Sequence, residues 1–136
     1  MTLAPKPKII SPLYIRETRQ VDPIQSSILK KIKDQGKICL PVPNGLLFCV
    51  PDEIRYMQAL SNYTNVHFSN GEKKLLCKTL KELQGLFPVQ YFARIHKSYI
   101  VNIKCITGYS RSRLNHLFIL ENGEQLPVSR SFAKTI

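Results

Sequence analysis

The pattern of hydrophobic and polar positions divides the chain into three stretches. Residues 1–23 hold four prolines among polar and basic residues, a composition typical of an extended tail or linker. Over residues 24–35, apolar residues recur at helical spacing, lysines occupy other positions, and Gly36 is well placed to end the helix. Short apolar segments separated by turn residues follow, as in β-hairpins. The sequence thus predicts a tail, a short amphipathic helix and a β-rich domain over residues 36–136.

Within residues 36–136, strands are expected where apolar segments lie between turn residues. The expected strands are 37–42, 46–50, 54–60, 65–68, 99–101, 106–109, 117–120 and 125–128. One helix interrupts them and begins near Thr79. Leu80, Leu83 and Leu86 form its apolar face, and Pro88 stops it. We therefore expect one helix packed on a sheet.

Composition and charge narrow the classes of partner. Hydrophobic residues make up 43% of the chain and charged residues 21%, which is enough apolar material for a globular core. The chain carries 20 Lys and Arg against 9 Asp and Glu, a formal net charge of +11. A basic surface binds nucleic acid through counterion release, although anionic lipid and solubility are alternative explanations of the charge.

Little in the sequence indicates chemistry or a metal. The four cysteines form no CxxC pair and lie among apolar neighbours, so we expect buried, reduced thiols and no metal or cofactor. A dyad of His96 with Ser98 or Cys105 is the best catalytic candidate, but nothing orients it, and we expect no enzyme. No membrane-spanning run or signal peptide is evident, which predicts a soluble, cytoplasmic protein with no membrane contact.

Basic, amide and hydroxyl side chains concentrate in three predicted turns, at residues 60–64, 94–98 and 128–131. Lys and Arg favour phosphates and guanine, Asn reads adenine, and hydroxyls bind phosphates. Taken singly, each segment also has a structural explanation: Asn62 makes a tight turn, Tyr63 belongs to the core, and Arg130 is a solvated cation. Only the combination of the three segments favours nucleic-acid binding.

Together the segments resemble the LytTR family of DNA-binding domains over residues 36–136. The matching stretches are IRYMQALSNYTNVHF (54–68), KTLKELQGLF (78–87), FARIHKSYIVNIKCI (92–106) and LPVSRSF (126–132). The resemblance is specific because RIHKSYIVN is followed about thirty residues later by LPVSR.

The resemblance implies a mainly β fold of small antiparallel sheets and hairpins with one or two short helices, preceded here by the N-terminal helix. It implies a bacterial transcription regulator that reads double-stranded DNA with loops in the major groove. Two domains, as a possible homodimer on DNA, would occupy direct repeats about one helical turn apart. Family members usually carry a receiver domain, whereas only a short helix and tail precede the domain in this sequence. The DNA-facing positions of the family map onto Ser61, Asn62, Lys97, Arg130 and Ser131.

The side chains themselves suggest roles at and near these positions. Lys97 and Arg130 are the expected base or phosphate contacts, and Asn62 is the expected adenine reader. We expect Ser98 and Ser129 to fix the register through phosphates and Arg94 to serve as a second cation nearby. His96 is expected to order its own loop by hydrogen bonding. Arg111 and Arg113 are either phosphate contacts at the edge of the site or solvated cations. Ser131 is shorter than the residue found in many relatives, which limits its reach.

Two other functions compete with sequence-specific DNA binding. The first is a basic adaptor that binds an acidic protein or dimerises through the N-terminal helix, but its loops carry few aromatic residues. The second is RNA binding, for which the sequence shows no solvent-facing row of aromatic residues.

Overall fold

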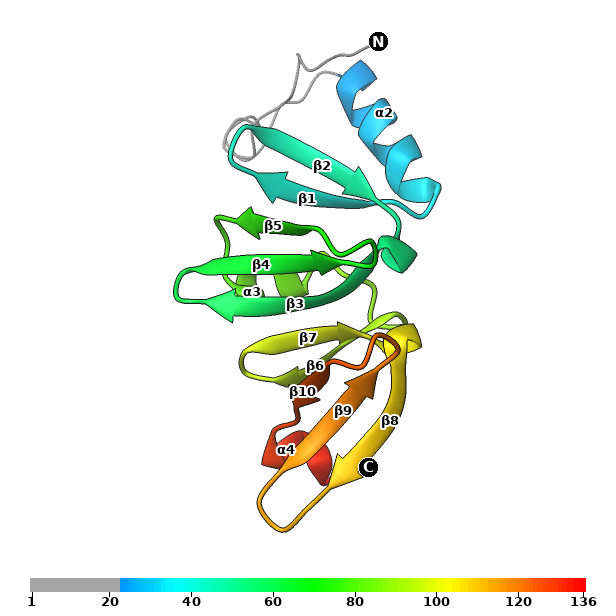
Figure 1. The fold of residues 1–136 in the computed structure, drawn as a ribbon. Coiled ribbons are helices and arrows are strands. Elements are labelled where there is room, and N and C mark those ends of the chain that lie inside the picture. The colour runs from blue at the N-terminus through cyan, green and yellow to red at the C-terminus, as the bar shows by residue number, and fades with distance from the viewer. Residues whose placement is uncertain (1–22) are drawn as a thin grey trace.

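The computed structural model describes residues 23–136, with side chains from Ile28 onward, so the predicted tail lies outside the described residues apart from Pro23. Three antiparallel sheets follow one helix and are stacked with the largest in the middle (Figure 1). The elements are α2 (Pro23–Asp34), β1 (Ile38–Val42), β2 (Gly45–Cys49), η1 (Pro51–Glu53), β3 (Ile54–Leu60), β4 (Tyr63–Phe68), β5 (Lys73–Leu76), α3 (Leu80–Gln84), β6 (Phe92–His96), β7 (Tyr99–Asn102), η2 (Ile103–Cys105), β8 (Ile106–Arg111), β9 (His116–Leu120), β10 (Gln125–Pro127) and α4 (Arg130–Ala133).

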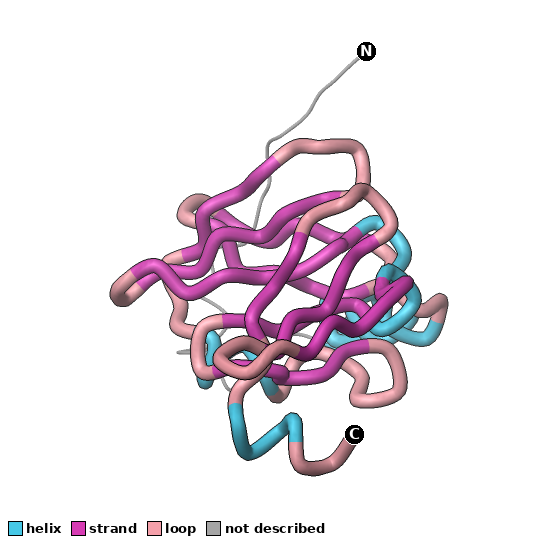
Figure 2. The backbone as a smooth tube through the Cα atoms, turned by 60° about the horizontal axis from the view of Figure 1, so that its bottom comes forward, coloured by secondary structure: helices cyan, strands magenta, loops and turns pink. Residues whose placement is uncertain are grey.

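The sheets contain two, five and three strands within the described residues. Their strand orders are β1-β2, β5-β4-β3-β7-β6 and β10-β9-β8. The strands fill the middle of the molecule, and α4 stands away from them at the C-terminal end (Figure 2). This arrangement confirms the predicted fold class of small antiparallel sheets with few short helices.

Helix α2 confirms the helix predicted before the domain. Lys31 and Lys33 occupy its last turn, where positive charge favours the helix dipole, and Gly36 follows with φ of 83°, a left-handed conformation that suits glycine. Among its described side chains, which begin at Ile28, Ile28 is 51% exposed, and the half-buried Leu29 and Ile32 belong to neither core cluster.

One hydrophobic cluster lies between the five-stranded sheet, the β1–β2 hairpin and α3. Met57 and Val66 are paired across β3 and β4 and are fully buried. They pack in one cluster with Leu40 from β1 and Leu83 from α3. Burying each such aliphatic side chain stabilises the fold by roughly 1.5 to 3 kcal/mol. This cluster ties the first hairpin and α3 to the middle sheet.

A second cluster joins the five-stranded sheet to the three-stranded sheet. Tyr56 and Val101, paired across β3 and β7, are buried together with Leu120 of β9 and Leu126 of β10. The Tyr56 hydroxyl donates a hydrogen bond to the Glu124 carboxylate at 2.9 Å. Burial and the Glu124 interaction together raise the pKa of Tyr56 well above its usual value, which keeps this donor protonated. The three-stranded sheet is thereby held in a fixed position beside β6 and β7.

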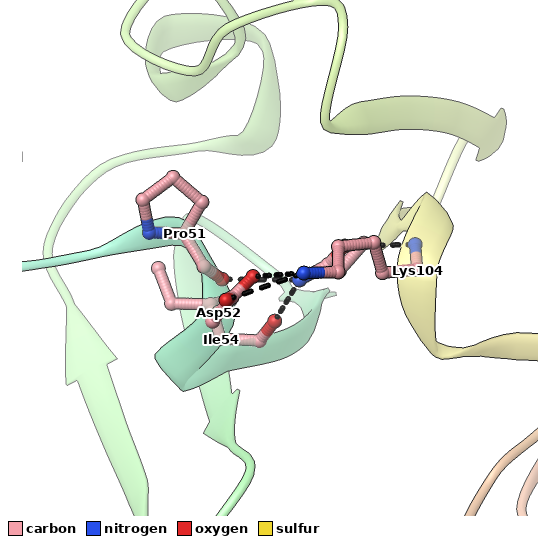
Figure 3. A network of polar contacts seen from close by, with 5 residues as sticks. Pro51, Asp52, Ile54 and Lys104 are labelled. Atoms are coloured by element: carbon pink, nitrogen blue, oxygen red, sulfur yellow. Dashed lines mark hydrogen bonds and ion pairs between the residues drawn. The ribbon is translucent and has the colours of Figure 1, made fainter. Parts of the chain in front are cut away.

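Asn102 is buried at the junction between β7 and the start of β3, beside Pro51, Ile54 and the Asp52–Lys104 pair that Figure 3 labels. Its Nδ2 donates hydrogen bonds to the carbonyls of Pro51 (3.0 Å) and Ile54 (2.9 Å), and its Oδ1 accepts one from the Lys104 N–H (3.0 Å). The side chain therefore satisfies backbone groups, as predicted, and links two connections distant in sequence. An exposed ion pair between Lys104 and Asp52, at 3.1 Å, lies beside it.

Besides the short turns η1 and η2, three elements were not predicted from the sequence. Strand β5 contains two lysines and lies at a sheet edge, so its residues are mostly exposed and its sequence has no apolar pattern that predicts a strand. Arg94 and His96 lie in strand β6, where a turn was expected. A register shift between these two residues breaks the alternation of apolar positions. Helix α4 is only four residues long and replaces the turn expected around Arg130.

Helix α3 is shorter than predicted. Thr79 caps its N-terminus by accepting a hydrogen bond from the Glu82 N–H at Oγ1, and the Glu82 carboxylate accepts one from the Thr79 N–H. The helix ends at Gln84, before Pro88 is reached. Leu80 and Leu83 are buried as expected, but Leu86 lies beyond the helix and is 46% exposed. Assigning Leu86 to the apolar face was therefore wrong.

The four cysteines are free, and they differ in exposure. Cys49 and Cys105 are buried as predicted, Cys39 is half-buried, and Cys77 is exposed, which contradicts the expectation of a buried thiol there. Burial, reinforced by nearby Glu53, raises the pKa of Cys49 to about 12, and burial with Glu121 raises that of Cys105 to about 11. Both buried thiols therefore stay protonated.

Candidate nucleic-acid interface

Antiparallel pairing brings the three polar segments to one edge of the molecule. Because β3 pairs with β7, the β3–β4 turn lies beside the β6–β7 turn, and the Ala59 N–H donates to the Ser98 carbonyl at 2.9 Å. The Ser129 N–H donates to the Ile95 carbonyl at 2.8 Å, which fixes the third segment against β6. We call this surface the turn edge and define it by Ser61, Asn62, Lys97, Ser98 and Ser129–Ser131. It lies along the left side of the molecule (Figure 1).

The β3–β4 turn presents two exposed polar residues. Leu60 pairs with Tyr63, so Ser61 and Asn62 alone form the turn, and Ser61 has φ of 57°, which non-glycine residues seldom adopt. Neither side chain has a hydrogen-bond partner within the described residues. Asn62 lies in a tight turn, as its structural explanation required, whereas Tyr63 is 46% exposed and does not belong to the core.

The β6–β7 turn is held by the side chains on either side of Lys97. The Arg94 guanidinium donates to the carbonyls of His96 (3.2 Å) and Lys97 (2.7 Å) and to Gln84 Oε1 (2.8 Å). His96 Nδ1 accepts the Ser98 N–H at 3.0 Å. Lys97 itself is exposed and makes no side-chain hydrogen bond or ion pair with the described residues. The turn is thus an ordered backbone that presents one free cation.

The electrostatic setting of His96 favours its neutral form. Burial lowers its pKa, and the positive charges of Lys97 and Arg94 lower it further. The neutral ring can accept the Ser98 N–H at Nδ1, a role that a protonated ring cannot fill. His96 therefore orders its own loop.

The third segment is organised by a helix cap. Ser129 Oγ accepts the Phe132 N–H at 3.1 Å and lies 3.3 Å from Ser131 Oγ, so Ser129 is the N-cap of α4. Phe132 packs edge-on against Phe118 of β9, which anchors the short helix. Arg130 is exposed and, within the described part of the chain, has no side-chain partner.

Acidic residues within 36–136 gather at the ends of the strands opposite to the turn edge. They lie in the connections before β3, after β4 and after β9. Hydrogen bonds join these connections to neighbouring ones, from the Ser69 N–H to the Glu53 carbonyl and from the Glu121 N–H to the Cys105 carbonyl. These residues are Asp52, Glu53, Glu72, Glu121 and Glu124. The sixth acidic residue in this range, Glu82, caps α3. The basic turn edge is thus separated from most of the negative charge.

A comparison with known families agrees with this geometry. Residues 44–136 match the family model of the LytTr DNA-binding domain. The chain belongs to the LytTR family. DNA binding is the function of this domain family, and the match includes the whole turn edge. Helix α2 and strand β1 precede the matched residues.

Individual relatives and a solved structure support the same assignment. The chain is 29% identical over 106 residues to the sensory transduction protein LytT of Bacillus cereus, and 29% identical over 105 residues to that of Bacillus subtilis. The matches cover 76% and 75% of this chain but only 42% of either relative, so the LytTR chain spans less than half of those proteins. A solved LytTr DNA-binding domain from Bacillus cereus superposes with a TM-score of 0.62 at 27% identity, covering 74% of this chain and 92% of that one.

The LytTR structure gives no support to the catalytic alternative. His96 lies at the turn edge, whereas the buried Cys105 lies in η2 beyond the far end of β7. His96 accepts the backbone N–H of Ser98, so its Nδ1 is already engaged. Among the described residues, no three His, Cys, Asp or Glu side chains are grouped to hold a metal ion. None of the described helices has the length and apolarity that a membrane crossing requires.

Proposed function

We propose that this LytTR domain binds double-stranded DNA in a sequence-specific manner, as the DNA-binding part of a bacterial transcription regulator. The β3–β4 turn, the β6–β7 turn and the Ser129–Ser131 segment enter the major groove. The observation that carries the proposal is the turn edge itself: three segments distant in sequence present Asn62, Lys97 and Arg130, all exposed and unpartnered within residues 23–136, from a hydrogen-bonded backbone.

The contacts within the turn edge suggest a division of roles. Asn62 suits bidentate recognition of adenine, and Arg130 suits guanine O6 and N7 or a phosphate. Lys97 contributes a mobile point charge for guanine or phosphate. In this proposal the hydroxyls of Ser61, Ser98 and Ser131 contact phosphates and fix the register.

The remaining candidates act through the backbone in this proposal. Arg94 was expected to be a second cation for DNA, but its three hydrogen bonds to the β6–β7 turn and to Gln84 make it a positioning residue. Ser129, predicted at a phosphate, caps α4 through its hydroxyl, and we assign it a positioning role. His96 orders the turn through the Ser98 N–H.

Two copies would read neighbouring sites on one face of the duplex. A single turn edge offers few base contacts, and a second copy on a direct repeat about one helical turn away would present its own turn edge to the next major groove. Such pairing supplies the affinity of two sites without requiring a large interface between the proteins.

Selection of duplex DNA from a random pool tests this proposal. The enriched duplex and a scrambled duplex of equal length are then titrated by fluorescence anisotropy at several salt concentrations. We expect a repeated short element, and a preference for it that persists as salt rises, because base contacts are less sensitive to salt than phosphate contacts. No enrichment, with both duplexes losing affinity equally, would contradict the proposal and favour the basic adaptor.

A further inference from the structure

We infer that this domain has a second DNA contact, a cationic groove between α4 and the β8–β9 turn that holds the sugar-phosphate backbone beside the bases read by the turn edge. The inference rests on the proposed function and extends it to a surface that reaches beyond the three segments. The groove has a volume of about 600 Å³. Its lining includes Arg113 and Asn115 of the β8–β9 turn, Arg130 and Lys134 of the α4 segment, and His96.

The β8–β9 turn is built to project its tip. Arg111 pairs with His116 at the end of the hairpin. The turn is closed by hydrogen bonds from the Ser112 N–H to the Asn115 carbonyl (2.8 Å) and from the Asn115 N–H to Ser112 Oγ (3.1 Å). Arg113 and Leu114 therefore stand at the tip, where Leu114 is 86% exposed.

Both walls of the groove are fixed to the same scaffold. The Val128 N–H donates to the His116 carbonyl at 2.8 Å, which joins β9 to the segment before α4. The Tyr109 hydroxyl and His116 Nδ1 lie 2.6 Å apart, which holds the hairpin near its turn. The groove is therefore formed before any ligand arrives, so little ordering is required on binding.

The charges in the groove point to a polyanion. Arg113, Arg130 and Lys134 are exposed, and none of their side chains has a hydrogen bond or ion pair with any described residue. No Asp or Glu lines the groove. Three unpaired cations that converge without a counter-charge fit a run of phosphates, and the exposed Leu114 offers an apolar contact to a deoxyribose.

The position of the groove favours duplex DNA over a small anion as its ligand. Arg130 belongs to both the groove and the turn edge, so the two surfaces are continuous. The β8–β9 turn lies beyond α4, farther from the β3–β4 turn than the other segments are (Figure 1). At the other extreme, the β1–β2 turn contains Pro43 and Asn44 and no cation. The extra phosphate contact is therefore on one flank of the site only.

Charge-removing variants on the selected duplex test the inference. We expect Arg113→Gln and Lys134→Gln each to weaken binding about three- to tenfold at low salt and to lower the slope of log K against log salt by roughly one, without changing base preference. Arg111→Gln is the matched control, because Arg111 is an exposed arginine of the same hairpin that does not line the groove. Its effect should be less than twofold.

Shortening the duplex from either end locates the contact. Removing base pairs on the flank next to those contacted by Arg130 should abolish the difference between wild type and Arg113→Gln, while shortening the other flank should preserve it. Equal effects of Arg111→Gln and Arg113→Gln, or a difference that survives on both shortened duplexes, would overturn the inference.

A failure of the groove inference can be distinguished from a failure of the proposed sequence-specific DNA binding. If Lys97→Ala weakens specific binding while Arg113→Gln and Lys134→Gln do not, the groove is excluded and the turn edge stands. If selection finds no preferred sequence, the same salt slopes on a mixed-sequence duplex still test the groove, with Arg111→Gln again as control.

Discussion

At the scale of single residues, the turn edge and the residues that support it contain two kinds of side chain. Lys97, Arg130 and Asn62 are exposed and have no partner among the described residues, whereas Arg94, His96 and Ser129 are engaged with the backbone that carries them. This contrast separates groups that can exchange water for DNA from groups that hold the turns in place. The two kinds should respond differently to substitution.

Lys97→Ala and Arg130→Ala test the contact residues. We expect each to weaken binding to the selected duplex by about 1 to 3 kcal/mol while leaving the unfolding transition unchanged, because both side chains are exposed. Anisotropy titrations measure the first effect and thermal unfolding the second. Lys73→Ala removes an exposed lysine at the opposite end of the strands and serves as control. A loss as large for Lys73→Ala would count against the assignment.

Arg94→Ala tests the positioning role. Loss of its hydrogen bonds to the His96 and Lys97 carbonyls should disorder the β6–β7 turn and weaken specific binding. The salt slope should stay as in the wild type, because Arg94 neutralises no phosphate, whereas Lys97→Ala should lower it by roughly one if Lys97 contacts phosphate. A reduced slope for Arg94→Ala would show that its guanidinium contacts DNA directly.

At the scale of elements, apolar segments bounded by clear turn residues could be predicted from sequence, and short or polar segments could not. Helix α2 and strands β1 to β4 are of the first kind, and their bounds were predicted to within two residues. Strand β6 is interrupted by a register shift, and β5 and α4 are too short for periodicity to be visible. The turn edge was predicted by residue type, but the roles of Arg94 and Ser129 depend on hydrogen bonds that no sequence pattern specifies. Lys134 was missed because it follows a helix that was not predicted.

The junction around Asn102 is an element whose stability can be tested separately from binding. Asn102→Ala would leave the buried carbonyl of Ile54 and the partly buried carbonyl of Pro51 without their donor, so we expect a loss of about 2 to 3 kcal/mol in the free energy of unfolding, measured by urea denaturation. Lys104→Ala breaks only the exposed ion pair with Asp52 and should cost less than about 1 kcal/mol. Equal losses for the two variants would contradict this account of the junction.

At the scale of the whole molecule, acidic side chains and the cations of the proposed DNA site lie toward opposite ends of the strands. Acidic side chains lie in the connections around Asp52, Glu72 and Glu121, while the turn edge and the groove beside it present cations that lack acidic neighbours. A basic surface of this kind orients the domain toward DNA before any base is read. The strands thus serve as a spacer between the two ends.

Stability should fall on acidification before any carboxylate is protonated. Burial lowers the pKa of both His67 and His96, so the folded state binds protons less readily than the unfolded state. Their contribution to stability is complete above about pH 6.5 and is lost as the pH falls below it. Urea denaturation between about pH 7.5 and about pH 5.5 measures this loss. It should be smaller in the double variant His67→Gln, His96→Gln, and an unchanged loss would contradict the assignment.

The most direct test of the account is to map which edge of the domain meets DNA. Backbone amide chemical shifts, recorded with and without the selected duplex, report on both ends of the strands at once. The account predicts that the largest changes fall at Ser61, Asn62, Lys97, Ser98 and Ser129–Ser131. Changes concentrated instead at the opposite connections, around Asp52, Glu72 and Glu121, would contradict it.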